Sequence, residues 1–235
     1  MSGSRNAMTL GIIGGAGVGA AARLYADVSF AYRAQTGALP RVLLWNIPLD
    51  DEIERGFTSR TPDPAAMAAA EALVVEGVQR LADGGASVIA MPCNSLQRVA
   101  AQESERAGIP FIDMIASTAG SARAQGSTSA VLLATEATVA AGFYDGYGVE
   151  MIAPPAPLQV ELKAIIGAAV AGSGEPHVLA SLLERARLPQ TPTILGCTDI
   201  CAMIEPDPAV VESLGCLTAR CVEVLASGAA VAPAA

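Results

Sequence analysis

The stretch SVIAMPCNS, residues Ser87–Ser95, decides the predicted fold, and the stretch TPTILGCTD, residues Thr191–Asp199, repeats its pattern. Each begins with an apolar run of strand length, passes through a small turn residue to a cysteine, and continues into polar residues that cap helices. We therefore expect a strand, a cysteine and a helix N-terminus, in that order, at both places. If the two segments belong to halves that fold alike and face each other, Cys93 and Cys197 meet across one cleft.

Working outward from the first stretch, apolar runs and helical spacing alternate along the N-terminal half of the chain. Short apolar runs predict strands over residues 9–13, 42–45, 87–91 and 111–114. Apolar residues spaced by three and four predict a helix over 64–83, and a second helix is predicted over 95–107. This alternation is typical of an α/β fold with a mostly parallel sheet.

A second half begins near residues 125–127, where small and polar residues interrupt the apolar pattern. The apolar run at 130–133 predicts a strand, and residues 210–226 have the apolar spacing of a helix that packs on one half. We therefore predict an α/β protein of two domains. The first comprises residues 8–118 plus about 208–228, and the second comprises residues 119–207.

The composition of the 235-residue chain disfavours several classes of function. A formal net charge of −9 argues against nucleic-acid and anionic membrane surfaces, because both need clustered Lys and Arg. No apolar run has the length of a bilayer span, and no secretory signal pattern opens the chain. Five cysteines without a disulfide spacing pattern indicate free thiols in a reducing compartment, so we expect a cytoplasmic protein.

Cys93 and Cys197 are the residues that point to chemistry. Each follows a predicted strand and precedes the first turn of a helix, where free backbone N–H groups and the helix dipole favour an anion. We therefore expect lowered thiol pKa values and available thiolates. Two like bases on opposite faces of one carbon suit a proton transfer in which a thiolate removes the Cα proton and the opposing thiol supplies one to the other face.

The remaining candidates for chemistry have simpler explanations. Cysteine is among the most buried residue types, so Cys201, Cys216 and Cys221 are explained as small hydrophobic residues. The single histidine, His177, is far in sequence from both cysteine motifs and is expected to face solvent. We predict no metal site. The acidic run at residues 50–54 is interpreted as a solvated loop.

At the two cysteine motifs the chain resembles the aspartate/glutamate racemase family, whose members carry Cys-Asn-(Ser/Thr) in one half and Gly-Cys-Thr in the other. Here the motifs are residues 93–95 and 196–198, and the likeness covers nearly the whole chain, including the opening Gly-Ile-Ile-Gly-Gly of residues 11–15. The resemblance implies two pseudo-symmetric three-layer domains with mostly parallel sheets and an active site in the cleft between them. It also implies a homodimer that racemises or epimerises a small amino acid, aspartate, glutamate or a related polar one, without pyridoxal phosphate (PLP) or another cofactor.

The resemblance also assigns roles to individual residues. It implies that Cys93 and Cys197 are the two catalytic bases. Lys163, the only lysine in the chain, occupies the place of a lysine that reaches the side-chain carboxylate in aspartate-specific members. The α-carboxylate and the amine are then held by Asn94, Ser95, Thr135 and Thr198. The further expected substrate contacts are Gly15, Ala16 and Asp199.

One loop departs from the pattern of the aspartate-specific members. Those members carry an arginine in the loop after the second strand, and the corresponding position here is Glu52. A glutamate there repels an acidic side chain and favours a cationic or hydroxylated one, unless Arg55 or Arg60 turns into the site. Ala16 replaces a methionine that members often carry, which leaves more room beside the substrate.

Other functions remain open at this point. Residues 15–20 fit the G-x-G-x-x-A fingerprint of dinucleotide-binding enzymes, but the second strand ends in Asn46 rather than an acidic residue. Relatives with these motifs include decarboxylases that use one cysteine and cis–trans isomerases, for example of a dicarboxylate, that use a cysteine nucleophile. A non-catalytic protein that binds a small molecule is the third alternative.

Overall fold

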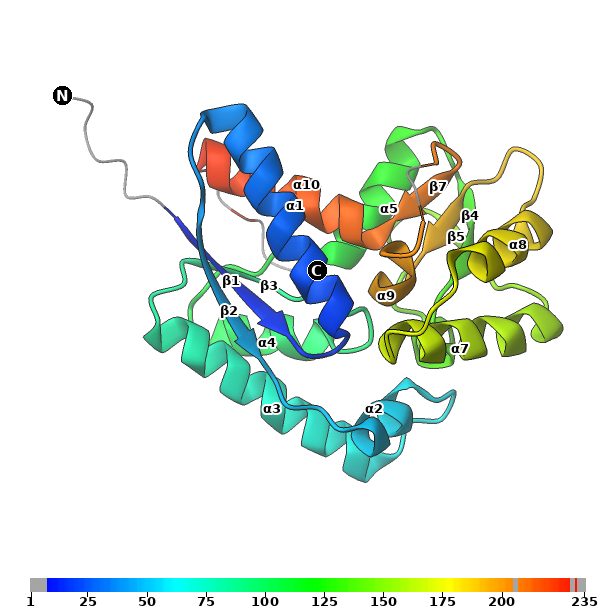
Figure 1. Cartoon of the computed structure of the whole chain (residues 1–235), viewed down its shortest axis with the longest axis horizontal. Coiled ribbons are helices and arrows are strands. Elements are labelled where there is room, and N and C mark those ends of the chain that lie inside the picture. The colour runs from blue at the N-terminus through cyan, green and yellow to red at the C-terminus, as the bar shows by residue number, and fades with distance from the viewer. Residues whose placement is uncertain (1–7, 205–206, 229–230, 232–235) are drawn as a thin grey trace.

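Two parallel sheets organise the chain in this computed structural model, which describes residues 8–204, 207–228 and 231 (Figure 1). The first sheet has the order β2-β1-β3. Its strands are β1 (Thr9–Gly14), β2 (Arg41–Asn46) and β3 (Val88–Ala90). Both neighbours run parallel to β1, with Ile12 opposite Leu44 and Ala90. The prediction of an α/β fold with parallel sheets is confirmed.

The second sheet has the order β5-β4-β6-β7, and all its pairs are parallel. Its strands are β4 (Ser129–Leu133), β5 (Glu150–Ile152), β6 (Thr193–Leu195) and β7 (Val210–Glu212). β3 and β6, which precede the two cysteines, are each paired with the first strand of their half. The two cysteine turns therefore occupy equivalent places in the two sheets.

Helices cover both faces of the first sheet (Figure 1). Leu10 and Ile12 of β1 lie in one apolar cluster with Leu24 and Leu217, whereas Ile13 points to the other face. The two-sided burial explains why β1 is apolar at nearly every position. The helices of this half are α1 (Val18–Thr36), α2 (Asp51–Thr58), α3 (Pro64–Asp83) and α4 (Gln97–Arg106).

The remaining helices surround the second sheet and join it to the first. They are α5 (Met114–Ala124), α6 (Glu136–Ala140), α7 (Ala156–Val170), α8 (Pro176–Ala186), α9 (Thr198–Cys201) and α10 (Ser213–Ser227). α10 packs against both α1 and α5 and lies beside α1 in Figure 1. Among the described residues, no helix has both the length and the apolarity that a membrane span requires.

Several predicted elements differ from the structure. The predicted strand at 111–114 is reduced to one bridge between Phe111 and Ile89, because Asp113 caps α5 directly afterwards. The acidic run at 50–54 is mostly helical: it opens α2, because the Asp50 carboxylate accepts a hydrogen bond from the Ile53 N–H. The helix predicted over 210–226 begins only at Ser213.

The boundary placed at residue 208 is wrong for β7. Residues 210–212 pair with β6 and belong to the second sheet, although they were assigned to the first domain. An apolar Val-Val pair fits a strand as well as a helix, and the pairing with β6 decided between them. α10 does contact α1 of the first half, but it packs equally against α5 and spans both halves.

Candidate active site

Cys93 and Cys197 line one cavity of about 480 Å³ between the two halves. Cys93 lies three residues after β3, and Cys197 lies two residues after β6. Both turns are at the carboxyl ends of parallel strands, the edge at which open α/β sheets bind their ligands. Cys93 is partly exposed to the cavity and Cys197 is buried.

Backbone N–H groups donate toward each sulfur, but burial dominates the ionisation of both thiols. The donors are Ser95 and Leu96 at Cys93, and Asp199 and Ile200 at Cys197. Loss of hydration raises the pKa of Cys93 to about 12, and it raises the pKa of Cys197 well above its ordinary value; the charge of Asp199 raises both further. The expectation of lowered thiol pKa values is wrong, because desolvation outweighs the helix N-termini.

Asp199 is the charged group that both thiols share. Burial, followed by the charge of Glu54, raises the pKa of Asp199 to about 7. Its carboxylate lies against the loop after β1, where a Cβ on Gly17 would meet the Asp199 oxygen at 2.2 Å. Gly17 also has a φ of +88°, so a glycine is needed there both for its conformation and for the close approach of Asp199.

Hydroxyl groups from both halves converge beside the cysteines. Thr198 Oγ1 donates to the carbonyl of Pro92 at 2.6 Å and so joins the two cysteine turns. Ser95 Oγ lies 3.3 Å from Thr135 Oγ1 and 3.4 Å from Thr138 Oγ1. Asn94 is buried, and its Nδ2 has no hydrogen-bond partner in the part of the chain that the structure describes. These groups offer donors to an anion bound in the cavity.

The family follows from comparison with known proteins. The family model described as Asp/Glu/Hydantoin racemase matches residues 13–232. The chain belongs to this racemase family. The prediction of an aspartate/glutamate racemase relative is therefore confirmed.

Solved structures of racemases share the fold at low sequence identity. Aspartate racemase from Picrophilus torridus is 22% identical, with a TM-score of 0.72, and the match covers 93% of this chain and 94% of that chain. An aspartate racemase homologue from Pyrococcus horikoshii OT3 is 20% identical, with a TM-score of 0.70 and coverage of 93% and 99%. Arylmalonate decarboxylase matches with a TM-score of 0.57, 18% identity and 96% coverage of both chains. At these identities the likeness shows the fold alone.

Most of the residues predicted for the racemase site line the cavity. They are Ala16, Cys93, Asn94, Ser95, Thr135, Lys163, Cys197, Thr198 and Asp199. Two predicted residues do not line it. Glu52 is exposed on α2, outside the cavity wall. Gly15 packs against the backbone of Ile47, whose oxygen would lie 2.1 Å from a Cβ at residue 15.

Apart from Arg55 and Lys163, which were candidates from the sequence, sequence reasoning missed the walls that α2 and α7 contribute. The α2 wall consists of Asp51, Glu54, Arg55, Phe57 and Thr58. The α7 wall adds Ile166, Gly167, Val170 and Ala171 to Lys163. Most members of each set are spaced by three or four, the signature of one helix face. The spacing in residues 51–58 becomes recognisable only once Asp50 is taken as a helix cap.

The two cations of the cavity wall are both paired with acids. Lys163 Nζ lies 2.9 Å from Glu136 Oε2, and Arg55 lies 3.7 Å from Asp51 across one turn of α2. Glu54 faces the cavity with no ion pair among the described residues, and burial, followed by the charge of Asp51, raises its pKa. The half-buried carboxylate that faces the cavity from α2 is therefore Glu54 and not Glu52.

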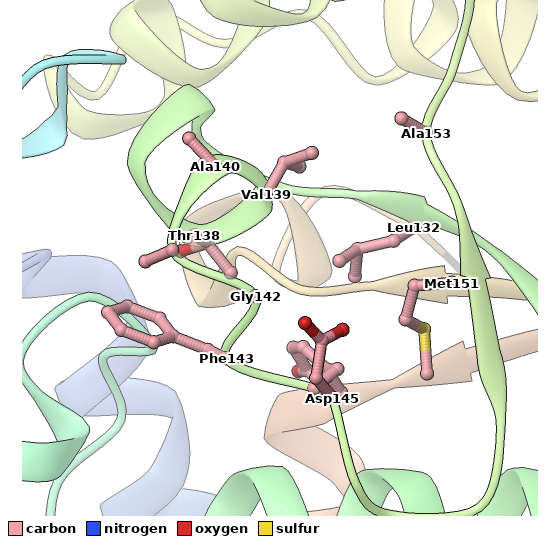
Figure 2. Close-up of a pocket in the computed structure, with 11 residues that line it drawn as sticks. Leu132, Thr138, Val139, Ala140, Gly142, Phe143, Asp145, Met151 and Ala153 are labelled. Carbon is pink, nitrogen blue, oxygen red and sulfur yellow. The ribbon is translucent and has the colours of Figure 1, made fainter.

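A second pocket, of about 220 Å³, is lined by residues of β4, α6 and β5 (Figure 2). Figure 2 shows the Asp145 carboxylate directed into this pocket and Met151 on its wall. No cysteine lines it, and its single carboxylate has no second base opposite. Among residues 8–204, 207–228 and 231, no group of three His, Cys, Asp or Glu side chains is arranged to hold a metal ion. The cysteine cavity is therefore the candidate active site.

Proposed function

We propose that the protein is a PLP-independent amino-acid racemase or epimerase in which Cys93 and Cys197 exchange protons with opposite faces of Cα. The observation that carries the proposal is that two cysteines from equivalent turns of the two halves line one cavity. Family membership supports racemisation as the type of reaction. In this mechanism the substrate lies between the two sulfurs.

The proposed reaction is a balanced exchange of protons. A thiolate on one cysteine breaks the Cα–H bond and becomes a thiol, and the electron pair passes to the Cα–carboxylate system. The thiol of the opposite cysteine donates its proton to the other face of Cα and becomes the thiolate. The configuration at Cα inverts, and the reverse reaction starts from the enzyme in the complementary protonation state.

Because the thiol pKa values are raised, we propose that the bound substrate itself favours formation of the thiolate. Both thiols resist ionisation, because they are buried and face Asp199. An α-ammonium group that binds beside Asp199 places a positive charge near both sulfurs and favours a thiolate. Asn94, Ser95, Thr135 and Thr198 supply the donors that stabilise the negative charge developing on the α-carboxylate.

The charges in the cavity wall favour a substrate side chain that is not anionic. Lys163 and Arg55 are each paired with an acid, whereas Glu54 is unpaired among the described residues. An aspartate or glutamate side chain near α2 would meet a like charge and would have to break an existing ion pair. We therefore propose a small polar or cationic amino acid as the substrate, with Glu54 in the selecting role first expected of Glu52.

The proposal is tested by incubating the purified protein with a panel of L- and D-amino acids in heavy water and following loss of the Cα proton by NMR. The panel spans acidic, cationic, hydroxylated and small apolar side chains. We expect at least one amino acid to gain deuterium and invert, and both Cys93→Ala and Cys197→Ala to abolish the inversion. Cys216→Ala, at a partly exposed thiol outside the cavity, is the matched control and should retain activity.

Two results would contradict the proposal. Inversion that survives both cysteine substitutions would exclude the two-base mechanism. A folded protein that exchanges no amino acid would instead favour a cis–trans isomerase, a decarboxylase or a binding protein built on the same fold.

The selecting role of Glu54 gives a separate prediction. Glu54→Gln removes the unpaired charge, so the ratio of kcat/KM for acidic to cationic amino acids should rise about tenfold or more. Glu52→Gln, two residues earlier on the exposed face of the same helix, should leave the ratio unchanged. An equal response of the two variants would mean that the general charge of α2, rather than a contact in the cavity, sets the preference.

A further inference from the structure

Only 1% of the surface of Tyr144 is exposed, and its side chain makes a hydrogen bond between the two halves of the molecule. It belongs to the turn region between α6 and β5 in the second half. Its hydroxyl donates to Asn94 Oδ1 at 2.7 Å, and Asn94 directly follows Cys93 in the first half. A buried phenol needs such a partner, and this one is found in the wall of the cysteine cavity.

The hydrogen bond determines which way the Asn94 amide faces. Asn94 is 4% exposed and lines the cavity, yet its Nδ2 has no hydrogen-bond partner among the described residues, while its Oδ1 accepts from Tyr144. Burial raises the pKa of the Tyr144 hydroxyl above its ordinary value, so the group stays protonated and remains a donor. If the amide turned over, the phenol oxygen could accept from its NH2 group, but the phenol proton would lose its acceptor and the amide oxygen would take the place of Nδ2.

The surroundings of Tyr144 reach the second cysteine as well. A Cβ on Gly196 would lie 3.5 Å from the Tyr144 hydroxyl and 2.7 Å from Leu132. Gly196 therefore leaves space for the Leu132 side chain directly before Cys197, and the phenol hydroxyl lies beside it at an ordinary contact distance. One buried hydroxyl thus lies close to the residue after one cysteine and to the residue before the other.

We infer that Tyr144 is a positioning residue, which holds the Asn94 amide with Nδ2 free to bind the carboxylate of the substrate. The inference rests on the proposed function for the identity of the substrate, but not for the geometry of the amide. Without the hydroxyl, the amide can rotate and present its oxygen, which repels a carboxylate. Tyr144 acts through Asn94 and does not itself contact the reacting carbon.

Turnover provides the first test, and Tyr147→Phe provides a matched control. Tyr147 is in the same loop, and its hydroxyl lies 3.3 Å from Asp113 Oδ2, with neither residue in the cavity wall. For the amino acid that the panel identifies, Tyr144→Phe should raise KM about tenfold or more and change kcat less, whereas Tyr147→Phe should change neither. In the Asn94→Ala background, Tyr144→Phe should have no further effect on KM. Additive effects of the two substitutions would overturn the inference.

A second test needs no turnover and uses acetate as the probe. The side-chain NH2 resonances of Asn94 are assigned in the 15N spectrum by their absence from Asn94→Asp. We expect acetate to shift them in the wild type and in Tyr147→Phe, but not in Tyr144→Phe. If Tyr144→Phe fails to fold, Asn94→Asp, which retains an acceptor for Tyr144 but has no NH2 group, is compared with the wild type by the shift that acetate causes at the backbone amide of Ser95, and this shift should be lost.

The outcomes separate this inference from the proposed function. An unchanged acetate response in Tyr144→Phe, an unchanged Ser95 response in Asn94→Asp, or no response in the wild type would each overturn the role of Tyr144. The expected acetate response, in a protein that exchanges no amino acid, would leave the role of Tyr144 standing and reject the racemase.

Discussion

At the scale of single residues, Asp199 makes the charge of the cleft depend on pH near neutrality. Its charge acts on both thiols, and its pKa of about 7 means that the carboxyl group changes its protonation state near neutral pH. The unpaired Glu54 raises that pKa further by adding a second negative charge. The negative charge of the cavity wall therefore changes with pH near neutrality.

The raised pKa of Asp199 predicts a loss of stability at neutral and higher pH. Between its ordinary value of 3.8 and about 7, the folded protein holds a proton that the unfolded chain has released. This contribution to stability is complete below the lower value and is lost as the pH rises through 7. We expect Asp199→Asn to be more stable than the wild type at pH 8 by about 2 to 4 kcal/mol, with a much smaller difference at pH 4.

Urea unfolding of the two proteins at a series of pH values measures this difference. Asp145→Asn, at an exposed carboxylate outside the cysteine cavity, is the control and should follow the wild type. Parallel stability curves for the wild type and Asp199→Asn would show that Asp199 does not hold the proton.

At the scale of elements, α2 links a local capping interaction to the shape of the cleft. The helix has 8 residues and begins where Asp50 accepts the Ile53 N–H at 2.8 Å. Its inward face brings Glu54 and Phe57 to the cavity. Because so short a helix has little stability of its own, its order depends on the cap and on packing against α3.

Asp50→Ala should therefore lower the stability of α2 and weaken substrate binding. Loss of an N-cap costs about 1 kcal/mol, so amide exchange at Ile53 and Phe57 should accelerate and KM should rise. Asp63→Ala removes the equivalent cap of α3, where Asp63 accepts the Ala65 N–H at 2.9 Å, on a helix that contributes nothing to the cavity wall. It should cost similar stability and leave KM unchanged, and an equal rise in KM for both variants would contradict the prediction.

The two helices also show what sequence reasoning could reach at this scale. α3 is predicted at its observed bounds, because its apolar spacing continues over 20 residues between a cap and two glycines. α2 is missed, because a short acidic run has the same composition as a solvated loop. Its helical state follows from one capping hydrogen bond and from burial of Phe57, neither of which composition reveals.

At the scale of the whole molecule, the two halves are joined by α10 and by Arg23 of α1. Arg23 donates to the carbonyl of Cys201 at 2.6 Å and lies 3.7 Å from Glu212 of β7. Cys201 ends α9, the short helix that begins directly after Cys197. The contact therefore ties the first half to the short helix that begins directly after Cys197.

Arg23→Met should loosen this connection while retaining most of the apolar stem. Loss of a partly buried hydrogen bond from a charged donor costs about 1.5 to 3 kcal/mol. We expect that loss in urea unfolding, together with a lower kcat for inversion as the distance between the sulfurs becomes less well defined. Arg33→Met, at an exposed position of the same helix, should change neither quantity. A stable but inactive Arg23→Met, or an unaffected one, would contradict a role in joining the halves.

The sequence by itself determined the alternation of strands and helices, the two cysteine turns and the family, because these depend on local apolar patterns and on short motifs within single segments. Only the tertiary structure decided that β7 belongs to the second sheet, that Glu54 rather than Glu52 faces the cavity, that Tyr144 engages Asn94, and that the thiol pKa values are raised. The physical reason is that each of these depends on burial or on a contact between segments far apart in the chain. Burial cannot be read from either cysteine motif, and its effect on the thiol pKa values is larger than that of the helix N-termini that both motifs predict.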